Sequence, residues 1–455
     1  MSLLALLQRR EAAGRPVRVG VIGAGTFSTA FLNQARRTPG LRVACVADIH
    51  PQKAWDACLA SGWPAGALAP GRSPGIVNDL LATGKVAITD DADHLLHADL
   101  DVVVECTGLT GPGAYHAWTA LDTGKHVVMV NVETDALLGH VLQQKAERHG
   151  LVYSMAYGDQ PAIISEMIDW ARVIGLEVVC AGKGTRYQPE YRYSTPDTVW
   201  DYMGFTREQV ETGHYNAQMY NSFLDTTKSA IEMCAVCNAN ELLPQVCGLQ
   251  FPAIGPQELP TVLKPAAEGG ILEQAGTVEV VASENRDGTP IQNNLRWGVY
   301  IVFKAGTPLV RRFFEMHDFL RDPSGEYGAY YRPFHMIGLE LGISVASVVL
   351  RGEATGSPIG FTADVAATAK KDLKPGDMLD GEGGYTVFGR LVPARQSVQE
   401  RHLPMGLSHD VQMIRPVAKD AVVTYDDVIV DESSLVYRLR RQQEEALRRS
   451  LHPIE

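Results

Sequence analysis

The chain has 455 residues, of which 45% are hydrophobic, and its 41 Lys and Arg residues stand against 53 Asp and Glu, a net charge of −12. This length predicts two or three domains with ample cores. No apolar run approaches the roughly 18 residues of a membrane span, and no long basic stretch indicates nucleic acid, so neither kind of partner is expected.

The first residues and the cysteines indicate the compartment. Arg9 and Arg10 follow a short apolar stretch, the reverse of the order in a signal peptide, so we expect an amphipathic N-terminal helix. Seven cysteines, an odd number, fit a reducing cytoplasm. Cys234 and Cys237 have the spacing of a metal-binding pair, but no second pair accompanies them, so we expect core thiols.

Residues 17–28 predict a strand, a glycine turn and the start of a helix. Gly23 permits the tight turn, and Gly25 lets the backbone approach a pyrophosphate. The N-terminus of the helix offers free N–H groups and a positive dipole end to this anion. The third glycine of the usual pattern is replaced by Ser28, and a turn without any ligand is the alternative. The cofactor contacts expected here are Gly23, Gly25, Thr26 and Phe27.

An acidic residue ends the next predicted strand, which covers residues 43–47. Asp48 lies 25 positions after Gly23, near the spacing at which a carboxylate hydrogen-bonds a ribose 2′-OH. Such an acid favours NAD and repels the 2′-phosphate of NADP, although His50 and Lys53 follow closely and could soften that repulsion. The sequence therefore predicts NAD or NADP as the cofactor and leaves the choice open.

Strand and helix patterns alternate up to about residue 157. Strands are expected over 86–89, 102–108, 126–130 and 152–156, and helices over 115–123 and 137–149. Apolar strands that alternate with helices predict a parallel sheet covered on both faces, and ligands should meet beyond the carboxyl ends of its strands. The residues expected at these ends are Thr107, Gly108 and Asn131 for the cofactor, and Asp159 and Gln160 for the substrate. Because Pro161 follows at a helix start, an N-cap role is the alternative for Asp159.

The pattern changes after residue 160. Helices are expected over 162–174 and 220–238, strands over 177–180, 276–282 and 297–304, and a polar, glycine-hinged turn over 182–187. A largely apolar helix over 335–350 is expected to be buried and to return to the first domain. Beyond residue 360 the sequence predicts a β-rich module and then a charged helix over 434–452 with a solvated face.

These changes predict an α/β protein with four parts. A Rossmann-type parallel-sheet domain is expected over 1–157, an α+β substrate and dimerisation domain over 158–355, a small β-rich module over 360–433, and a C-terminal helix or tail over 434–455.

Several motifs together resemble known proteins. Glu105-Cys106-Thr107-Gly108, Val130-Asn131-Val132, Gly158-Asp159-Gln160-Pro161, Gly182-Lys183-Gly184-Thr185 and the helix with Asp225 and Lys228 are similar to homoserine dehydrogenase. Residues 372–377, 403–407 and 425–428 resemble a SAF domain. Over nearly the whole chain, the combination resembles the deoxyxylulose-phosphate reductoisomerase-like family.

The resemblance implies an activity and an assembly. Members of this family use NADPH to rearrange and reduce 1-deoxy-D-xylulose 5-phosphate to methylerythritol phosphate, a step of isoprenoid biosynthesis. It also implies Mg²⁺ or Mn²⁺ held by carboxylates, and Asp159, Glu133 and Glu232 are conceivable ligands, but they form no tight cluster in the sequence. We expect a homo-oligomer, either a dimer or a tetramer.

Two positions depart from homoserine dehydrogenase. Those enzymes have a lysine directly after the asparagine that matches Asn131, where this chain has Val132. Asp225 precedes Lys228 by three positions instead of four, although either spacing keeps both side chains on one helical face. The first departure argues against homoserine or aspartate semialdehyde as the substrate.

Reduction of a carbonyl requires an acid or a cation beside the developing alkoxide. Lys228 is the first choice, because a lysine in a largely apolar helix is costly to bury unless it faces a cleft, with Asp225 one turn away. An ordinary surface ion pair is the alternative. Lys183 and Arg186, in a glycine-flanked turn, are expected to bind a phosphate or carboxylate, with loop solvation as the alternative. Lys183 is also expected to join the catalytic groups, and Tyr187 to contact the substrate.

The leading hypothesis is therefore an NAD(P)-dependent oxidoreductase that acts on a small polyhydroxylated substrate carrying a phosphate or carboxylate, with the reductoisomerase rearrangement as one form of the reaction. A simple dehydrogenase of a sugar acid or hydroxy acid is the alternative. A non-catalytic dinucleotide sensor, whose C-terminal module engages a protein partner, is a third hypothesis.

Overall fold

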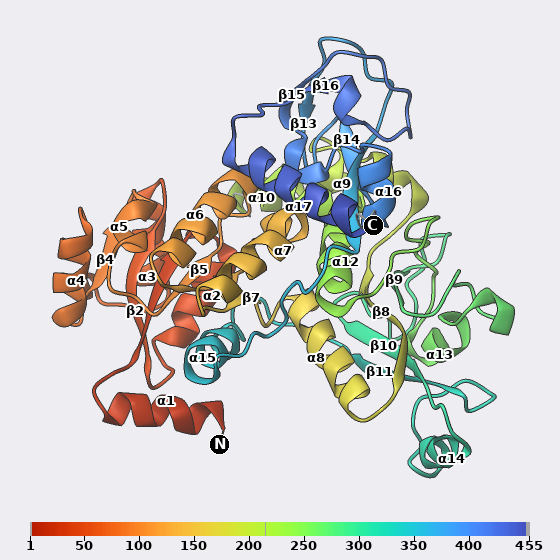
Figure 1. The fold of residues 1–455 in the computed structure, drawn as a ribbon, viewed down its shortest axis with the longest axis horizontal. Coiled ribbons are helices and arrows are strands. Elements are labelled where there is room, and N and C mark those ends of the chain that lie inside the picture. The colour runs from red at the N-terminus through yellow and green to blue at the C-terminus, as the bar shows by residue number, and fades with distance from the viewer. Residues whose placement is uncertain (1, 214, 452–455) are drawn as a thin grey trace. The chain divides into compact units, whose positions relative to one another are not determined.

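The structure is a computed structural model that describes residues 2–213 and 215–451. The chain forms two compact units (Figure 1). The first comprises Met1–Ile163 and Met336–Pro358, and the second comprises Ile164–His335 and Ile359–Glu455. The end of the helix expected over 434–452 lies outside the described residues. None of the described helices is long and apolar enough to cross a membrane.

A seven-stranded parallel sheet, in the order β3-β4-β2-β1-β5-β6-β7, forms the centre of the first unit. Its strands are β1 (Val17–Ile22), β2 (Leu41–Ala47), β3 (Leu68–Pro70), β4 (Val86–Thr89), β5 (Val102–Glu105), β6 (His126–Met129) and β7 (Tyr153–Met155). Strands β4 to β7 are buried with hardly any alternation, because helices cover both faces. The α/β fold with a Rossmann-type parallel sheet is confirmed.

The helices of the first unit connect these strands and cover the sheet. They are α1 (Leu3–Ala12), α2 (Thr26–Ala35), α3 (Pro51–Ala60), α4 (Pro74–Ala82), α5 (Ala92–Leu96), α6 (Thr110–Asp122), α7 (Val132–Arg148) and α15 (Gly342–Arg351). Helix α15 begins at Gly342, later than the helix expected from residue 335. Its Val345 and Val348 are buried in the same core as Val19 of β1 and Phe31 of α2.

The second unit contains a four-stranded sheet in the order β11-β10-β8-β9. Its strands are β8 (Glu177–Thr185), β9 (Thr277–Ala282), β10 (Val299–Lys304) and β11 (Tyr327–Arg332). The polar turn predicted over 182–187 is wrong, because β8 continues to Thr185. A Cβ on Gly182 would lie 1.8 Å from the carbonyl oxygen of Glu279, and one on Gly184 2.0 Å from that of Leu295. These glycines therefore serve the close approach of neighbouring chain segments.

The helices of this unit are α8 (Gln160–Val173), which begins in the first unit, α9 (Val199–Met203), α10 (Arg207–Gly213), α11 (Ala217–Leu224), α12 (Thr227–Asn240), α13 (Leu259–Val262) and α14 (Pro308–Met316). The single helix predicted over 220–238 is wrong in one respect. It is broken between α11 and α12, where Asp225 ends the first helix and Thr226 has a φ of 75°. Cys234 and Cys237 are buried on α12, as expected of core thiols.

The C-terminal part of the second unit is rich in strands. It contains β12 (Ala363–Ala369), paired with β14 (Val387–Pro393), and a sheet of β13 (Met378–Asp380), β15 (His409–Met413) and β16 (Val428–Ile429), with helices α16 (Ala394–Gln399) and α17 (Leu435–Leu451). The expectation that the charges of the last helix are solvated is wrong for Arg440. It is fully buried and pairs with Asp364 of β12 and Glu444 of α17.

Asp135 on α7 provides a test of the core of the first unit. It is buried beside Tyr153 of β7, whose hydroxyl donates to Asp135 Oδ1 at 2.8 Å, and burial raises the pKa of its carboxyl to about 7. Because this folded-state pKa lies above the unfolded value, stability is fully present below about pH 4 and falls as the pH rises towards 7. The stability of Asp135→Asn relative to wild type should therefore increase as the pH rises from about 4 to about 7, by at most about 4 kcal/mol.

Urea unfolding of the variant and of the wild type from pH 4 to pH 8 measures the difference between their free energies of unfolding. The contributions of the other acidic residues are common to both proteins and cancel in this difference. Asp79→Asn, at an exposed position of the same unit, is the matched control and should give the same difference at every pH. A difference for Asp135→Asn that does not depend on pH would refute the assignment.

Candidate active site

The glycine turn after β1 has the geometry that the sequence predicts. Gly23 has a φ of 95°, and a Cβ there would lie 2.8 Å from the carbonyl oxygen of Cys106. Gly25 is the N-cap of α2, no side chain caps this helix, and a Cβ on Gly25 would meet no atom within 4 Å. Thr26 and Phe27 are the first two residues of the helix. The uncapped N-terminus and the open space fit a pyrophosphate group.

Asp48 is held beside this turn. Its Oδ2 accepts a hydrogen bond from the backbone N–H of Ala24 at 2.9 Å, and its Oδ1 accepts one from that of His50 at 2.8 Å. The carboxylate is half-buried at the carboxyl end of β2, where it fits a ribose hydroxyl.

The loops after β5 and β6 are joined by a polar network around Glu105. Its Oε1 accepts a hydrogen bond from Thr107 Oγ1 at 2.6 Å and lies 3.2 Å from His116 Nδ1. Asn131 Nδ2 donates to the carbonyl oxygen of Leu109 at 2.9 Å and to Thr107 Oγ1 at 3.3 Å. The side chains of Thr107 and Asn131 thus hold the loop that contains Gly108, which has a φ of 70° and open space around its α-carbon.

Sequence reasoning missed the role of Glu105, which it used only as part of a motif. Glu105 is fully buried at the last position of an apolar strand. A charged residue at that position is the signal that could have identified it, because a buried carboxylate requires hydrogen-bonding partners nearby.

In the second unit, Lys183, Glu232 and Lys228 lie on two adjoining elements, β8 and α12. Lys183 of β8 and Glu232 of α12 form an ion pair, and both side chains are more than nine-tenths buried. Lys228, half-buried, precedes Glu232 by four residues on α12, so both lie on one face of the helix. Two ammonium groups and one carboxylate are thereby placed on adjoining elements. From the sequence, Glu232 was interpreted only as a conceivable metal ligand, so its ion pair with Lys183 was not predicted.

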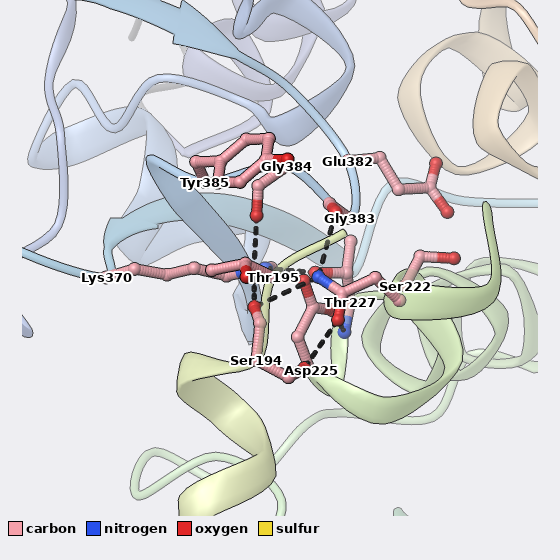
Figure 2. Close-up of polar contacts among 12 residues, drawn as sticks. Ser194, Thr195, Ser222, Asp225, Thr227, Lys370, Glu382, Gly383, Gly384 and Tyr385 are labelled. Atoms are coloured by element: carbon pink, nitrogen blue, oxygen red, sulfur yellow. Dashed lines mark hydrogen bonds and ion pairs between the residues drawn. The ribbon is translucent and has the colours of Figure 1, made fainter. Parts of the chain in front are cut away.

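Asp225 does not share a helical face with Lys228, because the break before α12 lies between them. It is fully buried, and its Oδ2 lies 2.8 Å from Lys370 Nζ (Figure 2). Burial raises the pKa of the Asp225 carboxyl above its usual value, and Lys370 acts against this rise. Lys370 was also missed, although a lysine directly after the apolar strand β12 was visible in the sequence.

The structure gives partners to the other predicted substrate contacts. Arg186 Nε donates to Glu284 Oε2 at 3.1 Å, and Tyr187 is buried with its ring stacked on that of Phe251. Asp159 Oδ1 accepts a hydrogen bond from the backbone N–H of Gln160 at 2.9 Å where α8 begins, and Gln160 is buried. Asp159 and Gln160 belong to the first unit, and Arg186 and Tyr187 to the second.

The conceivable metal ligands do not come together. Among residues 2–213 and 215–451, no three His, Cys, Asp or Glu side chains form a group that could hold a metal ion. Glu232, one of the ligands considered, is paired with Lys183.

Family models match most of the chain in two parts. Residues 19–155 match the NAD-binding domain of homoserine dehydrogenase, and residues 158–341 match the catalytic domain described as oxidoreductase DRL. The glycine turn and Asp48 lie in the first match, and Lys183, Lys228 and Glu232 lie in the second. Both matched models describe domains of oxidoreductases. No curated protein matches the sequence of this chain.

Similar solved structures are distant from this chain. A mutant 3-ketoreductase from Actinomadura kijaniata with NADP is 19% identical, with 38% of this chain and 49% of that chain covered and a TM-score of 0.24. Levoglucosan dehydrogenase with NADH is 17% identical, with 40% of this chain and 46% of that chain covered and a TM-score of 0.28. Scyllo-inositol dehydrogenase from Lactobacillus casei is 13% identical, with 63% of this chain and 73% of that chain covered and a TM-score of 0.33. The chain spans about half the length of the first two. These values are too low to indicate a shared substrate.

Gly25 allows the cofactor site to be tested without disturbing the fold. Its φ of −89° suits any residue, and a methyl group there would meet no protein atom, so Gly25→Ala should fold as the wild type does. The methyl group would occupy space next to the uncapped helix N-terminus, and we expect the affinity for NADH and NADPH to fall about tenfold or more. Fluorescence titration with each cofactor measures it.

Gly66→Ala, at another position with no atom near its Cβ, is the control and should leave both affinities unchanged. Equal affinities for wild type and Gly25→Ala would place the pyrophosphate elsewhere.

Proposed function

We propose that this protein is an oxidoreductase that transfers a hydride between NAD(P) and a small polyhydroxylated substrate that carries a phosphate or a carboxylate. The observation that supports the proposal is the group of Lys183, Glu232 and Lys228 on adjoining elements of the second unit. Two ammonium groups beside one carboxylate favour a negatively charged ligand and can stabilise an alkoxide.

Lys228 is the proton donor of the proposed reaction. Hydride transfer to a carbonyl carbon leaves a negative charge on oxygen, and Lys228 supplies a proton to that oxygen in reduction and accepts it in oxidation. Lys183 is neutralised by Glu232, and this pair keeps a second cation at a fixed place on β8. For Asp159, Gln160, Arg186 and Tyr187 we retain a role in substrate binding, and for Asp225 a positioning role.

The cofactor supplies the hydride chemistry when bound. The N-terminus of α2 at Gly25 would hold its pyrophosphate and Asp48 its ribose, while the loop of Thr107 and Gly108, supported by Asn131, would flank it. The resemblance to deoxyxylulose-phosphate reductoisomerase-like proteins supports 1-deoxy-D-xylulose 5-phosphate as the first substrate to test. We further propose a cytoplasmic homo-oligomer.

Replacement of Lys228 by Met should lower kcat by about 10²- to 10⁴-fold, the usual contribution of a positioned general acid. Cofactor affinity should stay unchanged, because the glycine turn and Asp48 belong to the other unit. Steady-state kinetics and a cofactor titration of the same preparation measure both effects. Lys374→Met, at an exposed position, is the control. Full turnover by Lys228→Met would exclude Lys228 as the donor.

The class of reaction can be determined from its product. With carbon-labelled 1-deoxy-D-xylulose 5-phosphate and NADPH or NADH, a reductoisomerase gives a branched carbon skeleton, which carbon NMR detects. A dehydrogenase of sugar acids or hydroxy acids leaves this compound unchanged and oxidises a member of a panel of such acids with NAD or NADP. Cofactor binding without hydride transfer to any compound would indicate a sensor and refute the proposal.

A further inference from the structure

Lys370 occupies an unusual position for a lysine. It follows the apolar strand β12, only 3% of its side chain is exposed, and its ammonium group lies within the protein. Its Nζ donates to the carbonyl oxygens of Ser194 at 2.7 Å and Gly384 at 2.6 Å and lies 2.8 Å from Asp225 Oδ2 (Figure 2). An ammonium group has three protons, and three partners from separate segments surround this one.

Asp225 connects Lys370 to the start of helix α12. Its Oδ1 accepts a hydrogen bond from the backbone N–H of Thr227 at 3.0 Å, so one carboxylate oxygen holds the first residue of the helix and the other faces Lys370. Thr227 Oγ1 in turn accepts a hydrogen bond from the backbone N–H of Gly389 in β14 at 2.8 Å. Residues of the C-terminal strands thus fix the N-terminus of α12 on two sides.

The backbone between the two helices is strained. Thr226 has a φ of 75°, and a β-branched residue rarely adopts this conformation. Such a conformation costs free energy and persists only where the surrounding contacts determine it. Lys370 and Gly389 supply such contacts, and Lys228 comes only two residues after the strained position.

The segment before the break is tied to the same C-terminal loop. Asn221 Nδ2 donates to the carbonyl oxygens of Gly383 at 2.8 Å and Ser194 at 3.0 Å. Gln218 Nε2 donates to those of Asp380 at 2.8 Å and Glu382 at 2.9 Å. The loop that accepts from Lys370 therefore also binds α11, so the break between the helices is held as one unit.

We propose that Lys370 is a positioning residue that acts through Asp225 to set the start of α12 and thereby the place of Lys228. This inference rests on the proposed function for its catalytic consequence, because Lys228 is the proposed proton donor. Its structural part concerns only the surroundings of Lys228 and can be measured without a substrate.

The test uses the full chain with Lys370→Met alone and with Lys370→Met combined with Asp225→Asn. The double variant removes both buried charges, while the amide oxygen of the introduced asparagine can still accept from Thr227, so it should regain stability lost by the single variant. Arg440→Met is the matched control, because it also removes a buried cation from the C-terminal part of the unit, but its partners Asp364 and Glu444 do not contact the break.

Trace labelling of lysines with acetic anhydride, read by mass spectrometry from pH 7 to pH 11, reports the surroundings of Lys228. In the double variant the labelling rate of Lys228 should change about threefold or more, because the neighbours of its ammonium group change. The rate of Lys85, exposed in the first unit, should not change in any variant, nor that of Lys228 in Arg440→Met. An unchanged rate for Lys228 in the folded double variant would overturn the proposal.

Oxidation of NADPH with 1-deoxy-D-xylulose 5-phosphate, or with the acid identified in the panel, provides the catalytic readout. We expect kcat of the double variant to fall about tenfold or more with little change in cofactor affinity, because a displaced donor impairs proton transfer. If the double variant keeps the wild-type kcat while Lys228→Met is inactive, the positioning role of Lys370 is refuted and the proposed role of Lys228 stands. Full activity of Lys228→Met would refute the proposed function, while the labelling result would still decide the structural inference.

Discussion

A buried carboxylate needs a cation or hydrogen-bond donors, and cations meet this need at two places around helix α12. Asp225, just before the helix, meets Lys370 at the end of β12, and Glu232, in its second turn, meets Lys183 of β8. All four side chains are buried. The two pairs connect α12 to the C-terminal strands and to the four-stranded sheet, and Lys228 lies between them in the sequence. The position of this lysine therefore depends on elements from both halves of the second unit.

The polar groups of the first unit have two roles. Side chains around Glu105 hold the loops, whereas backbone N–H groups at the N-terminus of α2 face open space. Around Glu105, the side chains of Thr107, His116 and Asn131 contact one another or neighbouring backbone, so these groups determine the shape of the loop after β5. At the N-terminus of α2, in contrast, no side chain caps the helix and no atom fills the space beside Gly25. Unsatisfied helix N–H groups next to open space are what an anionic ligand requires.

The sequence predicts the parallel sheet and the glycine turn because the cause of each is local: apolar periodicity for the strands, and a positive φ at Gly23. It fails where the cause is distant. Glycines on either side of Lys183 look like a turn, yet they are needed because the chain at Glu279 and Leu295 approaches closely. Asp225 and Lys228 have helical spacing, but the partner of Asp225 is Lys370, which follows the remote strand β12, and no local pattern encodes that pairing.

Strand β12 shows what the buried ion pairs contribute beyond stability. Four of its seven residues are alanines, whose small side chains discriminate poorly between neighbouring registers. Asp364 near its start pairs with Arg440 of α17, and Lys370 after its end pairs with Asp225. A slip of one residue would turn both charged groups to the opposite face and separate Asp364 from Arg440 and Lys370 from Asp225, a cost of several kcal/mol for a buried ion that loses its partner. The charges thus specify a register that the apolar residues alone would define weakly: Asp364 connects the strand to α17, and Lys370 connects it to the start of α12.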